Sequence, residues 1–147
     1  MRNKISLRVK KTAAFVAAMA LIFTTGFASV KASDDNVQFN NFKLKAHYAN
    51  SYTASRYRQT TNTKNNWKVN LAYSSEGNNS IATFWLAKAN SNHTRVSATY
   101  DIHQGTGAHY YNAWSGASKT NVCLGAENNN DSAKEYTISG YWDEETN

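Results

Sequence analysis

Hydrophobic and polar side chains alternate with a period of two along much of the chain after residue 33. The clearest examples are residues 42–48, where lysines and a histidine separate apolar residues, and residues 67–73, where a lysine and an asparagine do so. This period places one face of a strand toward the core and the other toward solvent. Both segments are therefore predicted to be half-buried β-strands. The apolar face of the second strand holds Trp67, Val69, Leu71 and Tyr73.

The segment from Ile81 to Ala87 is apolar on both faces, with Phe84 and Leu86 opposed to Trp85. A strand that is apolar on both sides is typical of a central position in a sheet. Residues 74–80 form a polar turn before it. We therefore expect residues 81–87 to pair with residues 67–73 as a hairpin.

Shorter apolar segments follow at about residues 96–102, 108–114, 120–124 and 136–142, and turns rich in glycine, serine and asparagine separate them. Regularly spaced short strands with polar turns indicate an antiparallel β-sandwich or barrel. No segment after residue 33 has the pattern of an amphipathic helix. Residues 50–66 are consistent with an irregular strand or a short turn of helix. The predicted fold class is all-β, a small antiparallel sandwich or barrel that follows an N-terminal signal peptide.

The first 32 residues have a different pattern. A basic segment, Met1 to Lys11, precedes an apolar run over residues 13–23, and small residues follow. This order is typical of a secretory signal, here with cleavage between Ala32 and Ser33. The alternative is an uncleaved membrane anchor, because residues 12–30 are uncharged. The sequence predicts a signal peptide over residues 1–32 and one secreted β-domain over residues 33–147.

Charge is distributed unevenly between these two parts. The formal net charge of the chain is +6, but six of its sixteen basic residues and none of its ten acidic residues lie in residues 1–32. The rest of the chain is therefore neutral, with ten residues of each sign. A neutral exported domain is not expected to bind nucleic acid, and it is expected to associate with a membrane only if it acts as a toxin.

Cys123 is the only cysteine of the chain, so no disulfide can form within one molecule. It allows a disulfide-linked dimer, or it serves as a small buried apolar residue. Val122 and Leu124 flank it, so in a strand Cys123 points away from both. We favour the buried role.

Few residues suggest catalysis or metal binding. His47, His93, His103 and His109 lack the spacing of a zinc site, and no serine or cysteine lies in a recognisable nucleophile motif. Glu76, Asp101 and Glu127 are the carboxylates available for glycoside hydrolysis, which requires a spatial separation that sequence does not give. We expect no catalytic residue, no metal and no cofactor.

Aromatic side chains are the best candidates for binding, since residues 33–147 hold all four tryptophans and all nine tyrosines. Trp67 and Trp85 are expected in the core. Tyr110 and Tyr111 are adjacent, so one of the two is expected to be exposed. Asp143-Glu144-Glu145 is expected to be a solvated tail. The candidate binding residues, including two arginines beside Tyr57, are Tyr52, Arg56, Tyr57, Arg58, Tyr110, Tyr111, Trp114 and Tyr141.

Four segments together resemble a family of small exported proteins of uncharacterised function in Gram-positive bacteria. They are residues 57–62 (Tyr-Arg-Gln-Thr-Thr-Asn), 67–69 (Trp-Lys-Val), 104–107 (Gln-Gly-Thr-Gly) and 139–146 (Ser-Gly-Tyr-Trp-Asp-Glu-Glu-Thr). The resemblance covers residues 35–146 and implies an extracellular site of action, with no catalytic residues to transfer. More loosely, an aromatic-rich, cysteine-poor β-domain is similar to lactococcin-type bacteriocins.

The sequence thus favours a secreted, non-enzymatic interaction or effector module whose partner is a cell-envelope polymer or another protein. The alternative function is a bacteriocin-like antimicrobial protein. A cell-wall hydrolase is the third hypothesis.

Overall fold

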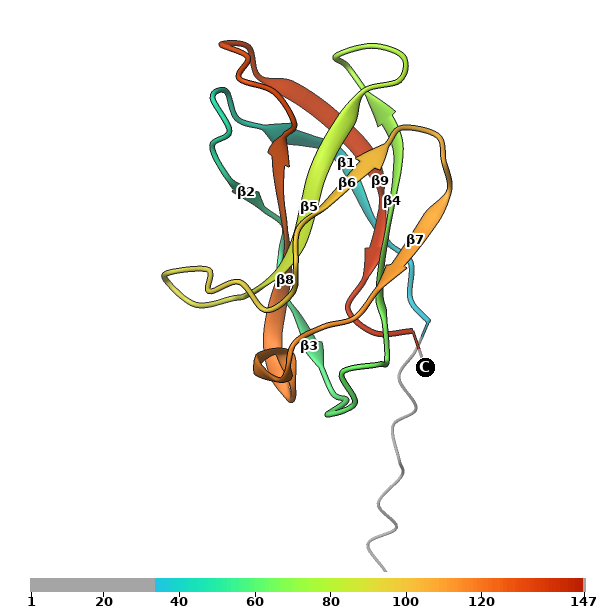
Figure 1. Cartoon of the computed structure of the whole chain (residues 1–147), viewed down its shortest axis with the longest axis vertical. Coiled ribbons are helices and arrows are strands. Elements are labelled where there is room, and N and C mark those ends of the chain that lie inside the picture. The colour runs from blue at the N-terminus through green and yellow to red at the C-terminus, as the bar shows by residue number, and fades with distance from the viewer. Residues whose placement is uncertain (1–33, 147) are drawn as a thin grey trace, which may run out of the picture.

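Residues 34–146, the part of the chain that the computed structural model describes, fold into two antiparallel β-sheets that pack face to face (Figure 1). The first sheet has the strand order β1-β9-β4-β7, and the second has the order β2-β8-β5-β6 with β3 also paired to β8. The strands are β1 (Val37–Leu44), β2 (Ser51–Tyr52), β3 (Arg56–Arg58), β4 (Trp67–Ser74), β5 (Ile81–Lys88), β6 (Tyr100–His103), β7 (Ala108–Tyr111), β8 (Thr120–Asn128) and β9 (Tyr136–Asp143), with a 3-10 turn η1 (Ser115–Ala117) before β8. The all-β prediction and the sandwich architecture are confirmed.

The core lies between the sheets and follows the period of two. Val69 and Leu71 of β4 face Phe84 and Leu86 of β5 across the sandwich, and all four side chains are buried. As expected, Trp85 points to the opposite side, where it forms a second small cluster. Strand β5 lies between β8 and β6, which confirms its predicted central position.

The predicted hairpin between residues 67–73 and 81–87 is wrong. Strand β4 pairs with β9 and β7 in the first sheet, whereas β5 pairs with β8 and β6 in the second. The turn between them crosses from one sheet to the other. Both strands direct an apolar face into the core, and the period of two requires only that, so the pattern of residues is compatible with either pairing. Strands β6 and β7 are likewise in different sheets.

Several strand boundaries also differ from the expectation. The strand predicted for residues 42–48 is β1, which begins at Val37 and ends at Leu44. His47 and Tyr48, both with φ of 55°, turn the chain away. Residues 96–102 and 108–114 form only the short strands β6 and β7. Residues 50–66 contain the two short strands β2 and β3.

A β-bulge in each of two strands changes which residues face outward. The register of β1 against β9 shifts between Phe39 and Phe42, and that of β4 against β9 shifts between Leu71 and Tyr73. An extra residue in a strand reverses the facing of the residues beyond it. Tyr73 therefore lies on the outer face of the first sheet and not on the inner face that strict alternation predicted.

The predicted signal peptide and its cleavage site at Ala32 and Ser33 lie outside the described residues. Within residues 34–146, no helix is long and apolar enough to cross a membrane.

Candidate binding surfaces

Three tyrosines lie on the outer face of the first sheet, and we call them the tyrosine face: Tyr73 on β4, Tyr110 on β7 and Tyr141 on β9. Tyr73 is 50% exposed, Tyr110 is 53% exposed, and Tyr141 is half-buried. Strand pairing fixes their arrangement. Tyr73 is opposite Ser139, Tyr141 is opposite Asn70, and Tyr110 is opposite Lys68.

Each tyrosine occupies a different row of outward-facing residues. Ser139 and Tyr141 are two residues apart on β9, and Lys68 and Asn70 are two residues apart on β4. Two residues span roughly 7 Å along a strand. The three rings therefore lie in successive rows, about 7 Å apart along the sheet and distributed over three neighbouring strands.

Amide side chains surround the middle ring. Gln38 of β1 and Asn70 of β4 are the cross-strand neighbours of Tyr141 on its two sides. Amides both donate and accept hydrogen bonds, and a ring supplies a flat apolar contact. This combination suits a polar, uncharged ligand with hydroxyl groups.

Lys68 adds no free charge to this face because it is buried and paired. Its Nζ contacts the carboxylate of Asp34 and lies 3.9 Å from Oδ2 of Asp143. Burial lowers the pKa of Lys68, but the hydrogen bond to Asp34 and the attraction of Asp34 and Asp143 outweigh it, so the pKa is raised overall. The ammonium of Lys68 stays protonated, and the neighbouring carboxylates balance its charge.

The acidic segment Asp143-Glu144-Glu145 is buried, so the predicted solvated tail is wrong. Glu144 accepts a hydrogen bond from Nε of Arg56. The carboxylate of Glu145 accepts hydrogen bonds from the backbone N–H groups of Gln59 and Thr60, at 3.0 Å and 2.9 Å. The segment closes one end of the sandwich, beside the start of β1 (Figure 1).

Arg58 is part of the same closure and is 1% exposed. Its guanidinium donates to the backbone carbonyls of Glu144, of Asn65 at 2.5 Å and of Asn62 at 3.2 Å. Burial lowers the pKa of Arg58, whereas the hydrogen bond to Glu144 raises that of Arg56. Both arginines, named as candidate binding residues, thus make contacts within the fold.

Asp143 is fully buried, and its Oδ2 has no hydrogen-bond partner within the described part of the chain. Burial raises the pKa of Asp143 to about 7, against the lowering effects of the Glu145 backbone N–H, Lys68 and Arg56. Burial therefore lets this carboxyl keep its proton at a much higher pH than an exposed aspartate does.

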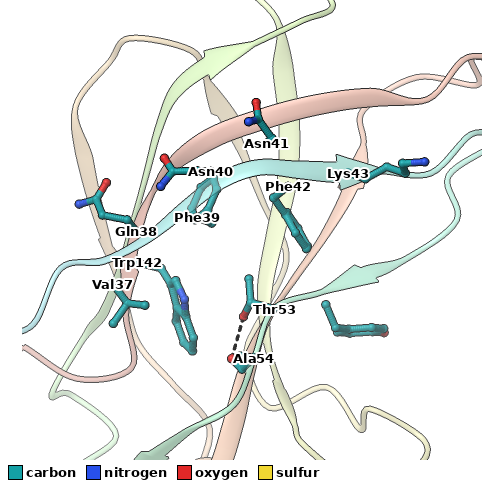
Figure 2. Close-up of a pocket in the computed structure, with 11 residues that line it drawn as sticks. Val37, Gln38, Phe39, Asn40, Asn41, Phe42, Lys43, Thr53, Ala54 and Trp142 are labelled. Atoms are coloured by element: carbon teal, nitrogen blue, oxygen red, sulfur yellow. Dashed lines mark hydrogen bonds between the residues drawn. The ribbon is translucent and has the colours of Figure 1, made fainter.

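An open groove runs between the edge strands β1 and β2, one from each sheet (Figure 2). It consists of two adjoining hollows of about 400 Å³ and 450 Å³. Both are lined by Phe42, Lys43, Tyr52 and Thr53. The pattern of residues gave no sign of the groove, because its two sides are far apart in the sequence.

A family comparison matches residues 25–146, a range that includes every described strand. The family is described as "Protein of unknown function (DUF2712)". The chain belongs to this DUF2712 family. Neither the curated proteins nor the solved structures contain a match to the chain. The prediction of an uncharacterised family is confirmed.

The aromatic candidates of this DUF2712 protein do not form one surface. Tyr110 and Tyr141 share the tyrosine face, and Tyr57 and Trp114 are exposed elsewhere. Tyr111 points inward and stacks on Tyr100, with 3.5 Å between ring centroids. The expectation that one of Tyr110 and Tyr111 is exposed is confirmed. Sequence reasoning did not identify Tyr73 as a binding candidate, because only the bulge in β4 turns its side chain outward.

Tyr52 belongs to the groove. Its ring stacks on that of His93, with centroids 3.8 Å apart, and meets Trp85 edge-on. The guanidinium of Arg95 lies over the ring of Trp85, with its Cζ 5.0 Å from the ring centroid. As expected, Trp85 and Trp67 are buried.

No group of three or more side chains suited to metal binding occurs within residues 34–146. Two of the three carboxylates that the sequence offers for glycoside hydrolysis lie in one row on the outer face of the second sheet. Asp101 and Glu127 are the cross-strand neighbours of Thr83 on its two sides, and Thr83 donates to Asp101 at 2.7 Å. Burial and Asp101 raise the pKa of Glu127, although Arg95 lowers it. Glu76 is elsewhere, 2.6 Å from Nδ2 of Asn130.

Cys123 of the DUF2712 protein is buried beside Trp85 and Ala87. Its Sγ lies 3.7 Å from the carbonyl oxygen of Ala87, and burial raises the pKa of the thiol to about 11. The buried role favoured from the sequence is confirmed.

Proposed function

We propose that this DUF2712 protein is an exported, non-enzymatic binding module that holds an uncharged glycan of the bacterial cell envelope on its tyrosine face. The observation that carries the proposal is the placement of Tyr73, Tyr110 and Tyr141 in successive rows of one exposed sheet face. Side chains on strands are held rigidly, so the rings bind with little loss of conformational entropy.

The chemistry of the face supports a polymer over a small ligand. Three rings spread over three strands present a long, shallow surface instead of an enclosed pocket, and an extended chain contacts them in turn. Gln38 and Asn70 provide hydrogen bonds to hydroxyl groups beside the middle ring. The neutral balance of residues 33–147 supports an uncharged partner.

Export supports a partner outside the cell. The basic segment, apolar run and small residues of residues 1–32 have the order of a secretory signal. The envelope of a Gram-positive bacterium is the surface that such a protein meets first. We therefore place its action in the wall or the surrounding medium.

Sedimentation with isolated cell walls tests the proposal. The protein, produced with its leader and purified after secretion, is incubated with insoluble wall glycan, and the bound fraction is measured. Tyr110→Ala and Tyr141→Ala are each expected to weaken binding about tenfold, since a lost ring contact costs roughly 1–1.5 kcal/mol. Tyr57→Ala is the matched control, because Tyr57 is equally exposed on the other sheet. Equal binding by all variants would contradict the proposal.

A glycan hydrolase is the second candidate, and the row Asp101–Thr83–Glu127 is the observation that favours it. The backbones of the outer two residues are two strand spacings apart, roughly 10 Å. Inverting glycosidases hold their carboxyl groups about 6.5–9.5 Å apart. Release of reducing ends from wall glycan that Asp101→Asn abolishes would support this activity. A wild-type protein that releases none would exclude it.

The bacteriocin-like alternative rests on the resemblance in composition. The same secreted protein, added at micromolar concentration to growing Gram-positive cells, tests it. Unchanged growth would remove this alternative and leave the binding module.

A further inference from the structure

The groove between β1 and β2 is apolar at one end. Figure 2 shows Val37, Phe42 and Trp142 pointing from one side toward Thr53 and Ala54 on the other. The amides of Asn40 and Asn41 point away from this space. The β1 bulge produces this separation, since it puts two polar residues outside and the aromatic residues on either side of them inside.

The other end of the groove is cationic. Lys43 and Lys45 line it together with Ser51, Tyr52 and His93. Lys43 forms a solvent-exposed ion pair with Glu135, with 2.9 Å between Nζ and Oε2. Lys45 is exposed and makes no ion pair with any residue of the described chain. This end therefore carries positive charge that the fold itself does not neutralise.

Ser51 gives an independent indication of a ligand at this cationic end. The side chain is only 3% exposed, and its Oγ has no hydrogen-bond partner within residues 34–146. A buried hydroxyl without a partner costs about 1–3 kcal/mol. A ligand oxygen at this position would remove the penalty, and Ser51 would donate the hydrogen bond.

We propose that this groove binds a single-chain anionic amphiphile. The hydrocarbon chain lies in the apolar end against Phe42 and Trp142. The anionic head group lies between Lys43 and Lys45, where it accepts a hydrogen bond from Ser51. The stacked rings of Tyr52 and His93 form the wall beside the head group.

The size and lining of the groove agree with this ligand. Each hollow falls within the 300–1,000 Å³ usual for small-molecule sites. A free sugar fits poorly, because the nearest amides point out of the apolar end and leave its hydroxyl groups without partners. An uncharged alkyl chain fits the apolar end, but it gives the two lysines no anionic partner and Ser51 no hydrogen-bond acceptor.

Calorimetric titration with dodecanoate, below its micelle concentration, tests the proposal, and dodecanol is the uncharged counterpart. We expect saturable binding of one dodecanoate per chain and at least tenfold weaker binding of dodecanol. Lys45→Ala is expected to weaken dodecanoate binding five- to tenfold, and Ala54→Trp, which fills the apolar end from an exposed position, is expected to abolish it. Lys64→Ala and Ala133→Trp are the matched controls, exposed and outside the groove.

Dodecyl phosphate distinguishes the head groups. Binding comparable to that of dodecanoate would show that the cationic end accepts either oxyanion, and weaker binding would assign it to carboxylates. No saturable binding of either, or equal binding by wild type and the two groove variants, would overturn the proposal. Tyr110→Ala is expected to bind dodecanoate as wild type does, so this test is independent of the tyrosine face.

Discussion

Arg58 donates a hydrogen bond to the backbone carbonyl of Glu144 and so joins the short strand β3 to the segment that follows β9, 86 residues later. Beside this contact, the carboxylate of Glu145 accepts hydrogen bonds from two backbone N–H groups of the segment that follows β3. A run of acidic residues is usually solvated, and here Asp143, Glu144 and Glu145 are buried. The sandwich is therefore closed at one end by charged groups instead of apolar side chains.

Arg58→Ala is expected to destabilise the protein by about 3–5 kcal/mol. The substitution removes three hydrogen bonds to backbone carbonyls and a buried positive charge beside Glu144 and Glu145. Urea denaturation followed by tryptophan fluorescence measures the change. Lys64→Ala, at an exposed lysine of the same connection, is expected to change stability by less than about 0.5 kcal/mol. A similar effect of both substitutions would show that the closure contributes little.

Asp143 is expected to make stability fall as pH rises from about 4 to about 7. Its pKa is about 7 in the folded protein against an ordinary value of 3.8, so over this range the folded state retains a proton that the unfolded state has lost. The free energy of unfolding is therefore higher at low pH, and this extra stability is lost as the pH rises to the folded-state pKa. Asp143→Asn removes this dependence.

The urea midpoint of wild type and of Asp143→Asn, measured between pH 4 and pH 8, checks this expectation. The variant should gain stability relative to wild type as pH rises, with the largest gain above pH 7. Parallel pH profiles would mean that Asp143 does not titrate abnormally.

Gly140→Ala is expected to destabilise the first sheet strongly. A Cβ at this position would lie 1.9 Å from the backbone oxygen of Asn70 and 2.8 Å from the ring of Phe39, so β9 and β4 would have to separate. The cost should exceed about 3 kcal/mol, as for severe overpacking. Thermal melting measures it, with Thr137→Ala on the same strand as the control. An unchanged melting temperature for Gly140→Ala would contradict the close strand packing.

Cys123 is expected to resist thiol reagents in the folded protein at pH 8. The thiol is buried, and its pKa of about 11 leaves little thiolate. We expect labelling only after unfolding, and a monomer on a non-reducing gel. Rapid labelling of the native protein, or a dimer that a reductant dissolves, would show that Cys123 is accessible.

The sequence predicts the facing of side chains well where strands are regular. In β5 the period of two correctly separates Phe84 and Leu86 from Trp85, because no bulge interrupts the strand. In β4 the same argument fails at Tyr73, since an extra residue in the strand leaves no signature in the hydrophobic pattern. The outward position of Tyr73 therefore could not be predicted from the sequence.

Long-range relationships are the part that the sequence does not predict. Periodicity states which face of a strand is buried but not which strand lies beside it, so β4 and β5 were paired wrongly. The burial of Asp143-Glu144-Glu145 depends on Arg56 and Arg58, which lie far away in the chain. The groove has the same origin, because β1 supplies one side and β2 the other.

A nuclear magnetic resonance titration of the labelled protein with a soluble fragment of wall glycan tests the binding function most directly. The account predicts chemical-shift changes in backbone amides around Tyr73, Tyr110 and Tyr141, on β4, β7 and β9, with β5, β6 and β8 unchanged. Shifts centred on Asp101 and Glu127 of the second sheet, or no shifts at saturating glycan, would contradict it.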